Sequence, residues 1–557
     1  MTLDAEAWPA SSDDGRARQA ALRSSDQVSA ATSLIEYRSA GHLLIIGNPS
    51  QAAELCRSLS DEITAYMLIP RAHANPGQPQ PERSLVSDVL EISGHLGAFS
   101  VTVDSPEGAL NVARLLRGAE QQTFDLVLDL QTKPHLQHDI PPAGYYAPHR
   151  DPARLQNAVH ELRELVGEFE KPKYFDYNAN LCVHGRNGKY ACRRCIDACP
   201  TLAIVSAGDH IEVDPYLCQG GGGCATACPS GAITYAYPTV SDTLGYLRGL
   251  LNAYYAAGGT HASVLFYDRE RGAALIDEAA ATLPEHLLAV AVEEIGSLGM
   301  DCWLACLAFG AADVNLLAAA GTAPSVTAEL QRQLHYCHAI LEGLAIEPAR
   351  VSLLQPEAPP ALPAAFTGAR RETLCRSPFE TFDEKRNTIF TALERLMQAG
   401  APVSDRFALP QGAPFGEIQV DTQGCTLCLA CASTCPANAL QGGGDMPLLR
   451  FIEANCVQCG LCASTCPEQV ISISPRLLLD AEARRAPRVL HEEQPFHCLD
   501  CGKPFATHKI IETMQTKLKD HWMFGDEAAM RRLELCDECR VKDMFQQQGG
   551  LSETDRN

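Results

Sequence analysis

Two stretches near the end of the chain, CTLCLACASTCP at 425–436 and CVQCGLCASTCP at 456–467, carry the same pattern of cysteines. Each reads C-x2-C-x2-C-x3-C-P, so the two runs are duplicates. The chain is long and shows no export signal, and cysteines grouped this tightly are then metal ligands rather than disulfide partners. Zinc sites are the alternative, but eight thiolates in this register disfavour them.

The duplicated pattern resembles the bacterial two-cluster ferredoxin family. In such a run, three thiolates of one tight loop cap one iron–sulfur cubane, and the fourth cysteine ligates the other cubane. The implied ligands of one [4Fe–4S] cluster are Cys425, Cys428, Cys431 and Cys466. The implied ligands of the other [4Fe–4S] cluster are Cys456, Cys459, Cys462 and Cys435.

An earlier cysteine block, at 182–228, follows the same pattern with two departures. Lys189 stands where the first cysteine is expected, and Cys182 is the obvious replacement, with the segment HGRNGKY forming a longer loop. The resemblance implies a [4Fe–4S] cluster held by Cys182, Cys192, Cys195 and Cys228. In the later run Gly221 replaces the second ligand, which leaves three thiolates: Cys199, Cys218 and Cys224.

Three outcomes are open at this three-thiolate site. A [3Fe–4S] cluster needs three ligands, a [4Fe–4S] cluster would keep one iron open to another ligand, and an incomplete site would hold no cluster. Cluster type follows ligand count, so we expect the [3Fe–4S] form first.

The last cysteines form two C-x2-C pairs, Cys498 with Cys501 and Cys536 with Cys539. Two such pairs suit a closed tetrahedral Zn²⁺ site with four thiolate ligands. A zinc-ribbon-like module is favoured over a further iron–sulfur cluster because the C-x2-C-x2-C loop is absent. His497 could replace one thiolate, but four cysteines leave no need for it.

The overall composition indicates a multidomain protein with ordinary cores. The chain has 557 residues, of which 46% are hydrophobic, and its net charge is −23 from 45 basic and 68 acidic residues. The negative charge disfavours nucleic acid as a partner. No apolar run of about 18 residues predicts a membrane span, and the polar start of the chain lacks a secretory signal, so we expect a cytoplasmic location.

Two segments show the alternation of strands and helices that is typical of small α/β domains. In the first, we expect strands at 43–47, 63–69, 99–103 and 124–130 and helices at 52–59 and 107–116. In the second, we expect strands at 263–268, 287–294, 313–318 and 351–355, as in a doubly wound parallel sheet. Ser377-Pro378-Phe379-Glu380 has the pattern of a capped helix start.

The predicted fold class is multidomain α/β plus α+β, with two small α/β domains, two dicluster ferredoxin modules and a zinc-ribbon-like module. The predicted segments in chain order are a disordered tail (1–33), an N-terminal α/β domain (34–150), a linker helix (151–172), ferredoxin module 1 (173–240), a second α/β domain (241–356), a linker with a helix (357–417), ferredoxin module 2 (418–476), the four-cysteine module (477–545) and a tail (546–557).

The second α/β domain resembles in layout the delta subunit of methyl-viologen-reducing hydrogenase, on the segment 290–318 with its turn at Gly296 to Gly299. It lacks most of that family's cysteines. Cys302 and Cys306 share a helix face and could form a redox pair or be remnant cluster ligands, but we expect buried core residues. Cys56, Cys337 and Cys375 have no partner at a useful spacing and are also expected in cores.

The whole architecture resembles bacterial multidomain 4Fe–4S proteins, some of which are encoded with molybdenum-dependent formate dehydrogenases. The expected function is transfer of single electrons through three or four clusters between a low-potential donor and a partner oxidoreductase. No dinucleotide-binding or radical motif indicates catalysis. Two alternatives remain: an enzyme that uses an open-iron cluster at Gly221, and a scaffold or maturation factor for a metalloenzyme.

Overall fold

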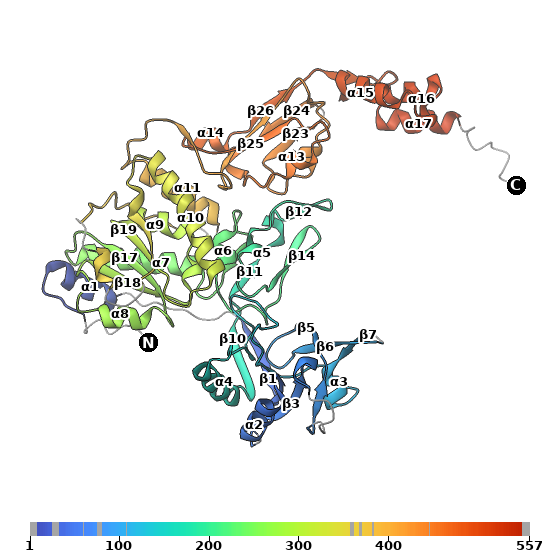
Figure 1. Ribbon diagram of the computed structural model, residues 1–557. Helices are drawn as coiled ribbons and strands as arrows, with labels where there is room; N and C mark the ends of the chain where they lie inside the picture. Colours follow the sequence, from blue (N-terminus) through green and yellow to red (C-terminus); the bar gives the residue numbers. More distant parts are fainter. Residues whose placement is uncertain are drawn as a thin grey trace.

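The computed structural model describes residues 8–24, 33–59, 61–74, 81–106, 108–356, 361–366, 370–380, 384–444 and 446–547. Figure 1 shows an N-terminal domain in blue, a green and yellow central domain beside a teal module, an orange module above them, and a red C-terminal module. Among the described residues, no helix has both the length and the apolar character that crossing a membrane requires.

The N-terminal domain is built on a parallel sheet whose strand order is β4-β3-β2-β8-β9. The strands are β2 (His42–Ile46), β3 (Thr64–Ile69), β4 (Ser84–Val86), β8 (Leu126–Asp129) and β9 (Tyr145–Tyr146). The central strands read as unbroken apolar runs because both faces of the sheet are covered. Helix α2 (Pro49–Leu59) packs against β3, as the sequence predicts.

Two elements of this domain differ from the prediction. The strand expected at 99–103 is β6 (Ser100–Ser105), but it belongs to a separate antiparallel sheet with β5 (Val89–Ser93) and β7 (Gly108–Asn111). The helix expected at 107–116 is wrong in its first half, because residues 108–111 pair with β6 as β7. Only α3 (Val112–Arg117) is helical, and Asn111 caps it. A local edge pairing therefore overrides helix propensity here.

A two-stranded antiparallel ribbon connects this domain to the rest of the chain. Strand β1 (Leu34–Ser39) pairs with β10 (Gly167–Pro172), which follows helix α4 (Pro152–Glu164). The amphipathic helix predicted from residue 151 is thus present, although it ends before the ribbon begins.

The prediction of a disordered tail over residues 1–33 is wrong for Trp8–Ser24. Helix α1 (Asp13–Ser24) packs along α7 (Val240–Ala256) of the central domain. The buried Asp14 carboxylate accepts hydrogen bonds from the hydroxyl of Tyr254 (2.8 Å) and the backbone N–H of Thr260 (2.9 Å). Polar anchoring of this kind leaves no apolar periodicity to detect. Residues 1–7 and 25–32 of that prediction lie outside the described part of the chain.

The central domain has a parallel sheet in the order β18-β17-β19-β20, and the four predicted strands are present. They are β17 (Ser263–Asp268), β18 (Leu287–Val292), β19 (Asp313–Leu317) and β20 (Val351–Leu354). The covering helices are α7, α8 (Ala273–Ala279), α9 (Met300–Phe309), α10 (Pro324–Gly343) and α11 (Lys385–Leu396). Helix α9 is buried along its whole length and packs against α7 and α11.

The helix start predicted at Ser377 is wrong. Residues 370–380 are not helical, and α11 begins at Lys385. The backbone N–H of Ser377 instead donates to the carbonyl of Ala308 (2.9 Å), and Phe379 is buried against the central domain. Tertiary contacts therefore hold this segment extended.

Module 1 consists of short elements around its cysteines. They are β11 (Phe175–Tyr177), β12 (Gly185–Arg186), β13 (Lys189–Tyr190), α5 (Arg194–Asp197), β14 (Ile204–Ala207), β15 (His210–Val213), α6 (Gly223–Ala227) and β16 (Ile233–Tyr235). Strand β11 pairs with β16 and thereby joins the two ends of the module. The segment HGRNGKY, predicted as a longer loop, forms the hairpin β12–β13.

Module 2 contains more of the chain than the predicted range 418–476. Its elements are β21 (Arg406–Ala408), β22 (Gly416–Val420), α12 (Ala430–Ser433), β23 (Leu440–Gly443), β24 (Met446–Phe451), α13 (Leu461–Thr465), β25 (Ile471–Leu478), α14 (Ala481–Arg485) and β26 (Arg488–Glu492). Strand β26 pairs with β24, so residues up to 492 belong to these sheets.

The C-terminal module therefore begins after residue 492. It has a hairpin of β27 (Pro495–His497) and β28 (Pro504–Thr507), followed by α15 (His508–Leu518), α16 (Glu527–Arg531) and α17 (Asp537–Gln547). The second cysteine pair lies at the start of α17 and not on a second hairpin. The module thus differs from a zinc ribbon made of two β-hairpins.

Candidate functional site

The cysteine loops of module 2 turn sharply so that donors face the sulfur atoms. Leu427 and Gln458 have positive φ values of 55° and 56°. The backbone N–H of Leu427 donates to Cys425 Sγ (3.4 Å), and the Gln458 side-chain amide donates to Cys456 Sγ (3.3 Å). Donors placed this way stabilise the negative charge of a thiolate.

Module 2 brings its eight cysteines together as two groups of four. Cys425, Cys428, Cys431 and Cys466 line one cavity with Leu427, Leu449 and Ile471. Burial raises the pKa of the Cys431 thiol to about 12, and repulsion from the other three thiolates of its cavity adds to the increase. Cys466, from the second run, therefore lies with the first three cysteines of the first run.

The other cysteine group of module 2 also contains one cysteine from the opposite run. Burial raises the pKa of the Cys459 thiol to about 11, and the charges of Cys456 and Cys435 raise it further. The charges of Cys456, Cys459 and Cys435 also raise the pKa of Cys462, and Cys431 of the first group adds a smaller contribution. Cys435, from the first run, therefore lies with Cys456, Cys459 and Cys462.

Module 1 holds its first group in a similar way. Burial raises the pKa of the Cys195 thiol, and the charges of Cys228, Cys192 and Cys182 raise it further. The sequence-based choice of Cys182 is thus compatible with the structure, and Lys189 is exposed on β13. His184 hydrogen-bonds through Nδ1 to the carbonyl of Cys192 (2.6 Å).

The three-thiolate site of module 1 is a pocket lined by Cys199, Cys218 and Cys224 together with Gly220–Gly222, Tyr174 and Tyr235. Gly221 is buried, and a Cβ built on it would lie 2.7 Å from Pro200 Cγ. A side chain at residue 221 would therefore collide with Pro200. Lys171 Nζ donates to the carbonyl of Cys218 and anchors this loop to the N-terminal domain.

These donor sets fit iron–sulfur clusters better than single ions. Thiolates that surround an inorganic core of several irons stand wider apart than the ligands of one ion. Among the described residues, the four sulfur atoms that lie within 4.8 Å of one another are those of the C-terminal group. Within the described residues, the module 1 and module 2 cysteines form wider groups, and sulfur and apolar side chains line their pockets.

The C-terminal cysteines Cys498, Cys501, Cys536 and Cys539 form one group that can hold a metal ion. Burial acts to raise the pKa of Cys498, but the backbone N–H groups of Cys501, Cys536 and Asp500 outweigh it and lower the pKa below its ordinary value. A thiolate is the form that binds metal. His497 is exposed and does not belong to the group.

We expect loss of metal from this group to unfold the C-terminal module. Its buried apolar cluster consists of Leu535 and the cysteines, with Phe505 packed against them, so packing alone contributes little. Structural zinc adds roughly 10–16 kcal/mol in comparable small domains. Cys536→Ser should lose the ion and make residues 495–547 sensitive to protease, without loss of iron. Cys375→Ser is the control, and a protease-resistant C536S variant would contradict the prediction.

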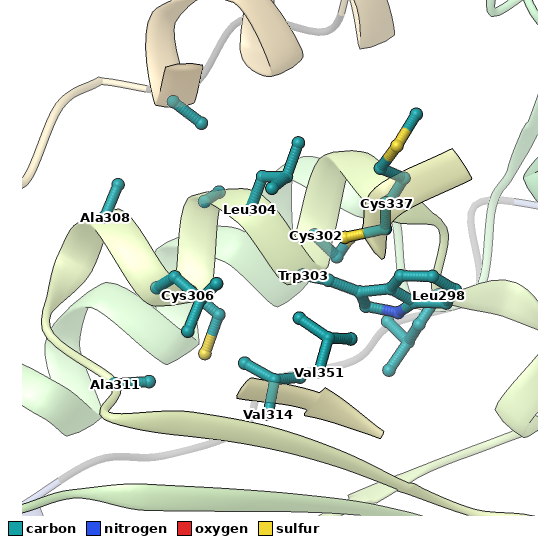
Figure 2. Close-up of a cluster of buried hydrophobic side chains, with 14 of the residues drawn as sticks. Leu298, Cys302, Trp303, Leu304, Cys306, Ala308, Ala311, Val314, Cys337 and Val351 are labelled. Atoms are coloured by element: carbon teal, nitrogen blue, oxygen red, sulfur yellow. The ribbon is translucent and has the colours of Figure 1, made fainter. Parts of the chain in front are cut away.

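The remaining cysteines lie in apolar surroundings. Cys302, Cys306 and Cys337 are completely buried, and Figure 2 shows Cys302 and Cys306 among side chains that include Leu298, Trp303 and Val314. Cys56 and Cys375 are half-buried and pack against cores. Apolar packing of this kind matches the core role predicted for them.

Cys302→Ala and Cys306→Ala are each expected to leave the iron content of the protein unchanged. Each change should lower the free energy of unfolding by about 1–2 kcal/mol, because a buried side chain is truncated. Iron analysis and thermal unfolding monitor the two effects. Loss of iron from either variant would show that these cysteines are ligands after all.

Sequence reasoning missed the cationic residues that hold the cysteine loops. Arg386 is half-buried and donates to the carbonyls of Ala454 (2.8 Å) and Cys456 (3.0 Å). Lys385 Nζ donates to the carbonyls of Ala225 and Thr226, both at 2.8 Å. Both residues lie far from the cysteines in sequence, and no local motif marks them.

The comparisons with known proteins agree with this geometry. Residues 424–471 match the family described as 4Fe-4S dicluster domain, and residues 211–234 match the 4Fe-4S binding domain. A protein of Azotobacter vinelandii described as "ferredoxin-like protein in nif region" is 38% identical over 66 residues, which cover 11% of this chain and 72% of that protein. The chain therefore belongs to the ferredoxin-type 4Fe–4S proteins.

Proposed function

We propose that this protein carries single electrons through three or four iron–sulfur clusters, from a low-potential donor to a partner oxidoreductase. The observation that carries the proposal is the exchange of Cys435 and Cys466 between the two cysteine groups of module 2. Such an exchange holds two clusters at a fixed separation inside one small unit. Bound clusters supply one-electron redox chemistry at that site.

The ligand sets proposed for module 2 are the two groups that the fold gathers, Cys425 with Cys428, Cys431 and Cys466, and Cys435 with Cys456, Cys459 and Cys462. In module 1, Cys182, Cys192, Cys195 and Cys228 are proposed to hold a third [4Fe–4S] cluster. The protein's contribution is to surround the sulfur atoms, to donate hydrogen bonds to them from N–H groups and to exclude water. Each of these effects tunes the reduction potential of a bound cluster.

The surroundings of Gly221 support a [3Fe–4S] cluster at Cys199, Cys218 and Cys224. An open iron needs space for a further ligand, whereas Pro200 fills the space in front of Gly221. Ile140 holds Pro200 in place, because the backbone N–H of Ile140 donates to the Pro200 carbonyl (3.1 Å). The packing of Pro200 against Gly221 favours electron transfer at this site over catalysis at an open iron.

The C-terminal group is proposed to bind Zn²⁺ as a structural ion, because four thiolates close around a single position with no open site. The partner is proposed to be a redox protein, with a molybdenum-dependent dehydrogenase such as a formate dehydrogenase as the class that the overall resemblance suggests. Nothing in the cysteine sites themselves specifies that partner.

Reduction and reoxidation of the anaerobically purified full chain test the proposal. Dithionite should reduce the clusters and an oxidised viologen dye should reoxidise them, through repeated cycles, with the iron content unchanged. Transfer of clusters to an apo-ferredoxin in the same assay, without redox turnover, would favour a maturation factor and overturn the proposal.

A further inference from the structure

The hairpin that replaces the usual first cysteine of module 1 reaches across to module 2. Its turn is fixed by Asp209, whose carboxylate accepts from the backbone N–H groups of Asn187 and Gly188, both at 2.9 Å. Strand β13 of the hairpin contacts helix α13, which carries Cys462. Arg186 extends from β12 to the carbonyl of Cys435 (3.5 Å). The departure from the ferredoxin pattern thus forms part of an interface between modules.

A second connection comes from two consecutive residues at the start of α11. Lys385 donates to the carbonyls of Ala225 and Thr226 on α6 of module 1, just before Cys228. Arg386 donates to the carbonyls of Ala454 and Cys456 in module 2. Because α11 packs along α9, both modules are tied to the central domain through one rigid helix.

A third contact lies beside the cysteines themselves. Arg194, two residues after Cys192, donates to the carbonyl of Gly412 in the segment before β22 (2.6 Å). The loop of module 1 that carries Cys192 therefore lies at the junction with module 2, as does helix α13 with Cys462.

We infer that the hairpin β12–β13 and the Lys385–Arg386 pair are positioning elements that align the two modules for electron passage from the cysteine group that contains Cys192 to the group that contains Cys435 and Cys462. This inference rests on the proposed electron-transfer function. One electron lost by one module is the electron gained by the other, and no bond is made or broken. Because electron tunnelling falls steeply with distance, a rigid junction here joins the two modules into one path.

The alignment also assigns the ends of that path. The group that contains Cys192 shares module 1 with the three-thiolate site, and the group that contains Cys459 shares module 2 with the group of Cys428. Cys428 is exposed, whereas the three-thiolate loop is covered by the N-terminal domain through Tyr37, whose hydroxyl donates to the Tyr216 carbonyl (2.7 Å). The exposed end of the path is therefore the group of Cys428, and the covered end is the three-thiolate site.

The test compares Lys385→Met with Arg395→Met in the full, cluster-loaded chain. Methionine keeps the bulk of Lys385 but removes both hydrogen bonds to module 1, and Arg395 is an exposed residue on the same helix. Pulsed EPR of the reduced protein measures the magnetic interaction between clusters of the two modules. We expect K385M to lose this interaction, with iron content and single-cluster spectra unchanged, and R395M to retain it.

A hairpin variant provides an independent second arm. Replacement of residues 186–189 by a two-residue turn should also lose the interaction between modules. Small-angle X-ray scattering should show a more extended molecule for both variants, and this readout needs no redox activity. Unchanged magnetic interaction and unchanged scattering in both variants would overturn the inference. Wild-type protein whose clusters accept no electrons would instead reject the proposed function, while the scattering still tests the alignment.

Discussion

Cys466→Ala is expected to convert one [4Fe–4S] cluster to a three-iron form or to remove it, and the cluster affected should be the one proposed for Cys425, Cys428 and Cys431. The three cysteines nearest to Cys466 in sequence are Cys456, Cys459 and Cys462, but the fold places Cys466 in the other group. Conversion to a three-iron form loses about one iron atom per chain, and loss of the whole cubane loses about four. Iron and acid-labile sulfide analysis measures the loss.

Double variants identify which cluster is lost, because changes at one cluster do not add, whereas changes at two separate clusters do. Cys466→Ala combined with Cys428→Ala should leave the other [4Fe–4S] cluster of module 2 intact. Cys466→Ala combined with Cys459→Ala should leave neither [4Fe–4S] cluster of module 2 intact. The reverse pattern, with additivity for Cys428 and none for Cys459, would contradict the exchange of ligands between the two runs.

Gly221→Cys alone is expected to destabilise module 1 without creating a fourth ligand. The added Cβ would lie 2.7 Å from Pro200 Cγ, and overpacking of this kind costs about 1–3 kcal/mol. Gly221→Cys combined with Pro200→Ala removes the obstructing atom. We expect the double variant to gain about one iron atom per chain and to lose the [3Fe–4S] signal in low-temperature EPR of the oxidised protein.

Pro200→Ala alone serves as the control for this experiment, since it makes room at Gly221 but adds no thiolate. It should retain the [3Fe–4S] signal. A G221C/P200A variant that keeps the [3Fe–4S] signal at full intensity would show that residue 221 does not face the cluster. Wild-type protein without any such signal would reject the three-iron assignment directly.

The resemblance to two-cluster ferredoxins implied that Cys466 lies with Cys425, Cys428 and Cys431, and these four cysteines line one cavity. The C-x2-C-x2-C loops are short, so their geometry is local, and the placement of Cys435 and Cys466 follows from the duplicated pattern. The parallel strands of both α/β domains were predictable for a similar reason. Buried strands such as Leu287–Val292 read as apolar runs that a helix face would not produce.

What the sequence did not show depends on contacts between distant segments. Helix α1 is held by Asp14, whose partners Tyr254 and Thr260 lie about 240 residues away along the chain. Lys385 and Arg386 act on backbone carbonyls, which are present at every residue and leave no signature in the sequence. The start of α11 was misplaced because Phe379 is buried in an extended segment, against its local capping pattern.

Metal and sulfide analysis of the anaerobically purified full chain, combined with low-temperature EPR before and after reduction, tests the central claim most directly. The account predicts a brown protein that contains inorganic sulfide, shows a [3Fe–4S] signal when oxidised and gives interacting [4Fe–4S] signals when reduced. A colourless protein without acid-labile sulfide, in which the cysteines of modules 1 and 2 hold zinc or no metal, would contradict it.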